Sequence, residues 1–78
     1  MATNVTTVFC RFRSYYWHAQ CSFPVLGAYE SKARIHRSAR QAADEVLSEI
    51  RAEHGPAVTM RRLSPKLYEI TVPKELQG

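Results

Sequence analysis

The stretch 38–56, SARQAADEVLSEIRAEHGP, carries the strongest structural signal in this chain of 78 residues. Apolar residues recur along it at spacings of three and four, which places them on one face of a helix. They are Ala39, Ala42, Ala43, Val46, Leu47 and Ile50. The spacing predicts a helix over about 39–54.

Both ends of this helix are marked in the sequence. Ser38 precedes Gln41 by three residues, the spacing of a capping box in which each side chain satisfies the other residue's free backbone N–H. Gly55 followed by Pro56 is typical of a helix end, because glycine adopts the left-handed conformation and proline cannot continue the helix. The outer face of the predicted helix is acidic and carries Asp44, Glu45, Glu49 and Glu53.

Segments rich in β-branched and aromatic residues flank the helix and predict strands. They are TTVFCRF at 6–12, AYESKARIHR at 28–37, AVTMRRL at 57–63 and KLYEITV at 66–72. Ser64-Pro65 separates the last two, and proline suits the second position of a type I turn, so a hairpin is expected. The segment 15–23 is open to a further strand. The predicted fold class is α+β: one small two-layer β-β-α-β-β domain over 1–78, with an antiparallel sheet and one helix packed on one face.

Strand alternation predicts which side chains face the helix. The inward set is Val8, Cys10, Phe12, Ala33, Ile35, Val58, Met60, Tyr68, Ile70 and Val72. The opposite parity holds Phe9, Arg11, Arg13, Lys32, Arg34, His36, Arg61, Leu67, Glu69 and Thr71. One solvent-exposed face is normal for an antiparallel sheet. A face with five Lys/Arg residues and one acid is nevertheless expected to bind a partner.

The net charge of +4 is unevenly distributed. Residues 1–40 hold six Lys/Arg and one acid, giving +5, whereas residues 41–78 hold five Lys/Arg and six acids, giving −1. The split indicates an interaction surface in the first half of the chain. Neither a signal-peptide pattern nor an apolar run of about 18 residues is found, which predicts a cytoplasmic protein without membrane contact.

Motifs of known enzymes are missing from the chain, so we expect no enzymatic activity and no cofactor. With three glycines, a phosphate-cradling loop is excluded in practice, and neither a nucleophile elbow nor a zinc-protease motif is present. Cys10, His18 and Cys21 lie in one segment, but a structural zinc site requires four ligands, usually in closely spaced pairs. Ten residues separate the two cysteines here. We therefore expect free thiols and no metal, with a zinc site or a Cys10–Cys21 disulfide as the alternatives.

Three consecutive aromatic residues, Tyr15, Tyr16 and Trp17, adjoin Arg11 and Arg13. They either pack over one end of a small core or form an exposed rim. Three neighbours in a strand cannot all point into one core, so at least one of them is expected to be exposed. Tyrosine, tryptophan and arginine are enriched at binding hot spots and also stack on unpaired bases. The predicted partner-binding residues are Arg11, Arg13, Tyr15, Tyr16, Trp17, Lys32, Arg34, His36 and Arg61.

The stretches YESKARIHRSARQAADEVLSEI (29–50) and LSPKLYEITVPKEL (63–76) resemble segments of small phage-encoded anti-CRISPR proteins. The arginine- and alanine-rich composition and the β-β-α-β-β order are similar to that family as well. The resemblance implies a viral inhibitor that binds a subunit of a type I CRISPR–Cas surveillance complex stoichiometrically in the bacterial cytoplasm. It assigns no role to individual residues. Since inhibitors that mimic DNA are acidic, a basic chain is not expected to work by DNA mimicry.

Two functions therefore stand as expectations. The first is a protein–protein inhibitor that meets an acidic patch of a Cas protein, or of another host complex, with an aromatic anchor from residues 15–17. The second is a nucleic-acid-binding module that uses the open sheet face, with arginines on phosphates and Phe9 or a tyrosine stacking on bases. An exposed edge strand is compatible with either a monomer or a homodimer.

Overall fold

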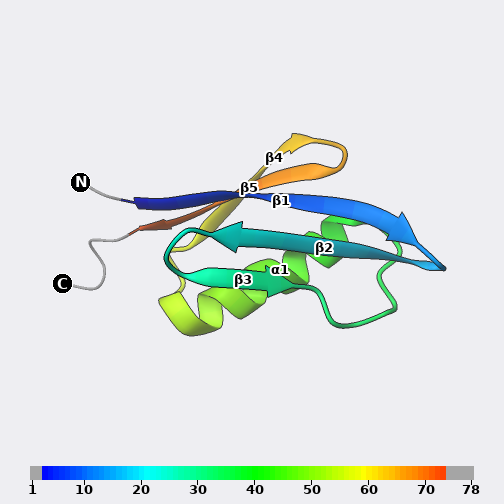
Figure 1. The fold of residues 1–78 in the computed structure, drawn as a ribbon, viewed down its shortest axis with the longest axis horizontal. Coiled ribbons are helices and arrows are strands. Elements are labelled where there is room, and N and C mark those ends of the chain that lie inside the picture. The colour runs from blue at the N-terminus through cyan, green and yellow to red at the C-terminus, as the bar shows by residue number, and fades with distance from the viewer. Residues whose placement is uncertain (1–2, 74–78) are drawn as a thin grey trace.

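One five-stranded antiparallel sheet is packed on its inner face by a single helix (Figure 1). The computed structural model describes residues 3–73. Residues 1–2 and 74–78 lie outside it, and so does the end of the stretch 63–76 on which part of the family resemblance rests. The elements are β1 Thr3–Arg13, β2 Tyr16–Phe23, β3 Gly27–Glu30, α1 Ala39–His54, β4 Thr59–Ser64 and β5 Leu67–Pro73. The α+β prediction is confirmed, and the segment 15–23 does supply a further strand.

The strands lie in the order β3-β2-β1-β5-β4, which makes β1 the centre of the sheet. Strand β1 pairs with β5 along its first half and with β2 along its second half, and Phe9 lies at the crossover, opposite both Leu67 and Gln20. The β1–β2 hairpin therefore runs on beyond the point where the β4–β5 hairpin turns back (Figure 1). This offset gives the molecule a length of 42 Å against 22 and 19 Å in the other directions.

The helix begins and ends where the sequence predicts. The Ser38 hydroxyl accepts the Gln41 N–H at 3.2 Å, and the Gly55 N–H donates to the Arg51 carbonyl with a glycine φ of 101°. One detail of the predicted capping box is wrong. The Gln41 side chain accepts the N–H of Arg37, at 2.7 Å, rather than that of Ser38.

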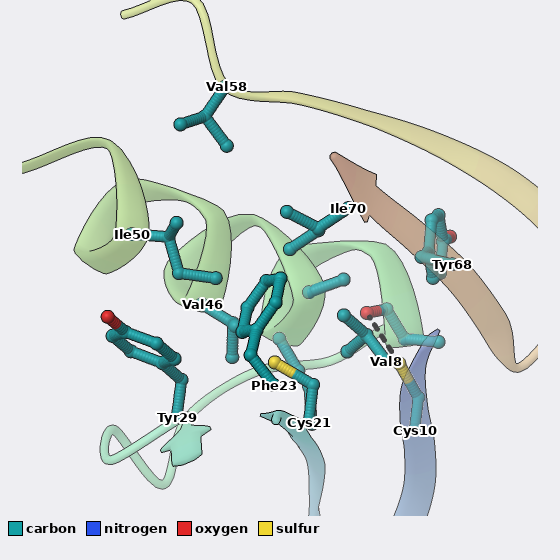
Figure 2. Packing of buried hydrophobic residues seen from close by; sticks show 14 of the residues in the cluster. Val8, Cys10, Cys21, Phe23, Tyr29, Val46, Ile50, Val58, Tyr68 and Ile70 are labelled. Carbon is teal, nitrogen blue, oxygen red and sulfur yellow. Dashed lines mark hydrogen bonds between the residues drawn. The ribbon is translucent and has the colours of Figure 1, made fainter. Parts of the chain in front are cut away.

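The core lies between the helix and the inner face of the sheet (Figure 2). The helix contributes Ala39, Ala42, Ala43, Val46 and Ile50, and the rest of the chain contributes Val8, Cys10, Ala19, Cys21, Phe23, Tyr29, Val58, Tyr68, Ile70 and Val72. Six of the ten residues predicted to face inward are buried, while Met60 and Leu47 are half-buried at the margin. The core residues on β2 were missed because no strand register was assigned to 15–23. Tyr29 on β3 has the same parity as Ala33 but was not included in the predicted inward set.

The predicted strand over 28–37 is wrong beyond Glu30. Ser31 ends the ladder, because its N–H donates to the Ala19 carbonyl and its hydroxyl accepts the Ala19 N–H. The N–H groups of Lys32 and Ala33 then donate to the Glu45 carboxylate on the helix instead of to a neighbouring strand. Residues 31–38, here called the connector, therefore cross from the sheet edge to the helix as irregular chain.

Two large side chains predicted to be buried are exposed. Ile35 is 77% exposed because it lies in the connector and not in a strand. Phe12 has the predicted inward parity, opposite Trp17, but is 58% exposed because the β1–β2 hairpin continues past the beginning of the helix. Strand alternation correctly predicted the side of the sheet on which Phe12 lies, but the helix does not extend far enough to cover it.

Both tight hairpins have two-residue turns. The turn Pro65-Lys66 places proline at its second position, as predicted, and the pairing of β4 with β5 has a register shift between Arg62 and Ser64. The turn Ser14-Tyr15 was not predicted, since neither residue is a turn former of the glycine or asparagine kind. Ser14 adopts a φ of 56°, which is unusual for a residue other than glycine. Within residues 3–73, the helix is too short and too polar to cross a membrane.

Candidate functional site at the hairpin end

The predicted partner-binding residues lie in three different places. Arg11, Arg13, Tyr16 and Arg61 have their parity on the open face of the sheet, Tyr15 is in the β1–β2 turn, Trp17 is on the helix side, and Lys32, Arg34 and His36 are in the connector. The open sheet face that strand alternation predicted for Arg11, Arg13, Lys32, Arg34, His36 and Arg61 is therefore wrong for the three connector residues. A subset nevertheless gathers at one end of the molecule.

The tip of the β1–β2 hairpin combines cations and aromatic rings. Arg13 lies directly opposite Tyr16 on the open face, and Arg11 lies opposite His18 two residues further back. Tyr15 is 95% exposed in the turn between the strands. The expectation that at least one of the three aromatic residues is exposed is confirmed by Tyr15.

The other face of the same hairpin carries an aromatic pair. The rings of Phe12 and Trp17 meet edge to face, with centroids 5.8 Å apart and an interplanar angle of 62°. Trp17 is half-buried and packs against the core, so it fixes the more exposed Phe12 ring in place. Both interpretations of the aromatic triplet are partly correct: Trp17 packs against one end of the core, and Tyr15 is exposed at the rim.

The connector brings further side chains to this end. The Trp17 N–H donates to the His36 carbonyl at 2.9 Å, so the connector runs beside the hairpin (Figure 1). Its exposed residues here are Arg34, Ile35 and Arg37. We call residues 11–17 together with Arg34, Ile35 and Arg37 the hairpin end. Arg37 and the exposed Phe12 and Ile35 are members that the sequence did not single out as binding residues.

Lys32 and His36 belong to the helix side and not to the open sheet face. The Lys32 ammonium bonds to Glu49 at 2.8 Å, and this hydrogen bond with its charge attraction raises the pKa of Lys32. The His36 ring lies 2.7 Å from the Glu45 carboxylate. The connector thus contacts two of the four acids on the outer face of the helix, Glu45 and Glu49.

All six carboxylates within residues 3–73 have a partner inside the molecule. Glu30 contacts His18, Asp44 contacts Arg40, Glu45 contacts His36, Glu49 contacts Lys32, Glu53 contacts Tyr29 and His54, and Glu69 contacts Arg61. The same residues hold ten of the chain's eleven Lys/Arg (Lys74 lies outside), and three of the ten take part in these pairs. The other Lys/Arg side chains have no carboxylate partner among these residues, so the unpaired charge is positive.

Four of the unpaired cations are at the hairpin end. Among the residues that the structure describes, no carboxylate or carbonyl bonds the side chains of Arg11, Arg13, Arg34, Arg37 or Lys66. Lys66 is close as well, since its carbonyl accepts the Cys10 N–H. Arg51 and Arg62 instead donate to main-chain carbonyls.

The open sheet face is less basic than predicted. Arg61 bonds to Glu69 at 2.9 Å, and Glu30, also on this face, lies 3.3 Å from His18. By register the face holds three arginines and two glutamates rather than five Lys/Arg and one acid. A depression of about 890 Å³ beside β1, β2 and β3 is lined mainly by uncharged side chains such as Val5, Phe9 and Ser22.

The cysteines are buried and free. Burial raises the pKa of Cys10 and of Cys21 to about 11, so both remain protonated and unreactive at neutral pH. The Cys10 thiol is held against the Ala39 carbonyl at 3.6 Å (Figure 2). His18 neighbours the buried Ala19 in β2 and so has the opposite parity, and no group of three possible metal ligands forms within residues 3–73.

A second polar cluster lies at the far end of the helix. The Tyr29 hydroxyl donates to Glu53 at 2.7 Å, and its oxygen lies 3.2 Å from the His54 ring. Burial and the hydrogen bond to the carboxylate raise the pKa of Tyr29 to about 12, so the hydroxyl stays a neutral donor. The cluster fastens β3 to the helix.

Comparison of the chain with protein-family models, with curated proteins and with solved structures found no match.

Proposed function

We propose that this protein is a small, non-enzymatic binding protein that engages an acidic partner protein through the hairpin end. The observation that carries the proposal is the distribution of charge. Every described carboxylate is bonded internally, while Arg11, Arg13, Arg34 and Arg37 have no acidic partner among the described residues and flank exposed aromatic and apolar side chains.

This combination matches the chemistry of binding hot spots. Arginine, tyrosine and tryptophan contribute most to such sites because they bury much area and also form hydrogen bonds. A rigid anchor costs little entropy on binding. The Trp17 side chain packs against the core, and its main-chain N–H donates to the His36 carbonyl. A stable complex buries about 1,200–2,000 Å² in total, which the hairpin end and the adjoining faces of the sheet can supply.

We further propose the anti-CRISPR class that the sequence resemblance implies, with a Cas subunit of a type I complex as the target in the bacterial cytoplasm. The support for this class is the sequence resemblance together with an unpaired cationic end. An inhibitor of this kind works by occupying a surface, and needs no catalytic group.

The test is a charge reversal at the hairpin end with a matched control. Arg11→Glu/Arg13→Glu should abolish protection of a targeted phage from a type I CRISPR–Cas system, and should abolish binding to the purified, nuclease-treated complex. Arg61→Glu/Arg62→Glu changes the net charge equally on β4 and should retain both. Circular dichroism of each variant verifies the fold. Full activity of the first variant would refute the proposal.

Nucleic acid is the second candidate, because arginines beside exposed aromatic rings also suit unpaired bases. The salt dependence separates the two. Binding to a duplex should lose about 0.9 log units of affinity per log unit of salt for each phosphate neutralised, whereas protein binding should respond to salt mainly in the association rate. Trp17→Ala should weaken a protein complex by about 2 kcal/mol or more, as at a hot spot.

A further inference from the structure

The β1 strand has an unpaired edge at the hairpin end. Strand β5 begins at Leu67, opposite Phe9, and the Cys10 N–H then bonds to the Lys66 carbonyl in the preceding turn. Beyond Cys10, the β5 side of β1 has no strand within residues 3–73, whereas β2 pairs with the other side as far as Arg13. A strand that is paired on one side only is a template for another strand.

Backbone alternation shows which groups this edge offers. Main-chain N–H and C=O groups of alternate residues point to alternate sides of a strand. Since the Cys10 N–H points toward β5, the groups of Phe12 point the same way, and those of Arg11 and Arg13 point toward β2. Phe12 therefore offers one donor and one acceptor to an incoming strand.

The side chains along this edge alternate in chemistry. Arg11 and Arg13 have their parity on the open face of the sheet, and Phe12 lies on the opposite face against Trp17. Phe12 is 58% exposed, so a neighbour can cover it. A strand added beside residues 11–13 would have its own side chains on the same two faces in the same alternation.

We propose that the partner is bound through an extended segment in which acidic and apolar residues alternate, added antiparallel to the edge at Arg11–Arg13. Its carboxylates meet Arg11 and Arg13 on the open face, and an apolar side chain covers Phe12, whose ring contacts Trp17, on the other. The mode is β-strand addition, in which main-chain hydrogen bonds give affinity and alternate side chains give specificity. The proposal rests on the proposed function and specifies the partner of the same site.

A second copy of this chain does not fit the edge. Antiparallel self-pairing about Phe12 would place Arg11 of one copy opposite Arg13 of the other, and like charges directly opposite destabilise a strand pair. An acidic segment removes that repulsion. Lys66, which lies in the turn beside Cys10 and has no side-chain partner among the described residues, adds to the attraction.

The experiment uses synthetic peptides and the fluorescence of Trp17, the single tryptophan of the chain. The probe is acetyl-Glu-Val-Glu-Val-Glu-Val-Glu-amide, and the control groups the same residues as four glutamates followed by three valines. We expect saturable binding of the alternating peptide that is at least about tenfold tighter than that of the grouped one, as a central hydrogen-bonded pair with side-chain contacts on two faces requires. Equal binding of the two peptides would overturn the proposal.

Methylation of the peptide backbone tests the hydrogen bonds directly. The valine opposite Phe12 donates its N–H to the edge, while the flanking glutamates point theirs away. N-methylation of the central valine should abolish binding, and N-methylation of a neighbouring glutamate should leave it within about twofold. Similar loss for both peptides, or for neither, would contradict strand addition.

Protein variants separate this inference from the proposed function. Arg11→Glu/Arg13→Glu and Phe12→Ala should lose the alternating peptide, and Arg61→Glu/Arg62→Glu should retain it. If Arg11→Glu/Arg13→Glu abolishes binding to the purified type I complex but the wild-type chain binds the two peptides equally, only strand addition is refuted. If that variant keeps the natural partner, the proposed function fails as well. Tighter binding of oligodeoxythymidine than of the alternating peptide would assign the end to nucleic acid instead.

Discussion

Glu45 holds the connector against the helix through three hydrogen bonds. It accepts the N–H groups of Lys32 and Ala33 and lies 2.7 Å from the His36 ring. Burial alone would raise the pKa of this carboxyl, but the hydrogen bonds to its ionised form outweigh burial and lower the pKa below its usual value of 4.5. The ionised carboxylate therefore adds stability above the unfolded-state pKa, and this contribution is lost as the pH falls through the folded-state value.

Glu45→Gln should lower the free energy of unfolding at neutral pH by about 1–3 kcal/mol, since hydrogen bonds to a charged acceptor are lost. It should also flatten the loss of stability below the usual carboxyl pKa of 4.5, where the wild-type carboxylate becomes protonated. Urea denaturation at a series of pH values measures both effects. Asp44→Asn is the control, because its exposed pair with Arg40 should contribute less than about 0.5 kcal/mol. Equal losses at the two positions would contradict the role given to Glu45.

Ser14 is the one described non-glycine residue with a positive φ, at 56°. The left-handed conformation costs an L-residue about 1–2 kcal/mol, and glycine avoids most of this cost while losing more entropy on folding. Ser14→Gly should therefore raise the free energy of unfolding by about 0.5 kcal/mol, measured by thermal denaturation. Tyr15→Gly, one position on, should lower it. A loss of stability in Ser14→Gly would mean that the turn relaxes in solution.

Single residues also explain which features of the site could not be predicted. The exposure of at least one of Tyr15, Tyr16 and Trp17 followed from the sequence, because three neighbouring aromatics cannot share one core, but the sequence did not show which one. The connector did not follow from the sequence, since AYESKARIHR alternates as a strand does, and long-range contacts such as those with Glu45 divert it. Nothing local distinguishes a glutamate that accepts N–H groups of a distant segment from one that faces water.

At the scale of elements, the helix was the most predictable part of the chain. Its bounds, its serine cap and its terminal glycine follow from periodicity and capping, which are local properties. The β1–β2 hairpin was less predictable because Ser14-Tyr15 has no turn signal, and the position of the helix beneath the sheet was not predictable at all. That position decides the exposure of Phe12, which strand alternation alone assigned to the core.

The buried stripe of the helix should dominate stability. Ile50 is fully buried, so Ile50→Ala should lower the free energy of unfolding by about 2–5 kcal/mol through lost transfer energy and a residual cavity. Leu47→Ala should cost less, since Leu47 packs at the margin of the core. Ser48→Ala on the exposed side should stay within about 0.5 kcal/mol. Urea denaturation would contradict this packing if Ser48→Ala cost as much as Ile50→Ala.

At the scale of the whole molecule, the excess positive charge is concentrated rather than spread. The basic character of the first half of the chain was evident from the sequence, but its location was not. The open sheet face loses much of its charge to pairs with Glu30 and Glu69, and what remains is at the hairpin end. Composition sets the net charge, and tertiary pairing decides where it acts.

Cation-exchange chromatography can measure that concentration. Arg11→Gln/Arg13→Gln and Arg51→Gln/Arg62→Gln remove the same number of charges, but only the first pair belongs to the hairpin end. A resin responds to local charge density, so the first variant should elute at lower salt than the second at neutral pH. Elution of both at the same salt concentration would show that the charge acts as a uniform field.

The first residue of β1, Thr3, is paired directly with the last residue of β5, Pro73. The Ser14-Tyr15 turn lies at the other extreme of the long axis (Figure 1). A carrier domain or surface attachment joined beyond either Thr3 or Pro73 therefore starts far from the hairpin end. The adjacency also suits a circular permutant, in which a short linker joins these two strands and new termini open at the Pro65-Lys66 turn. Such a permutant would free the edge beside Cys10 from its neighbouring turn and lengthen the template available to an incoming strand.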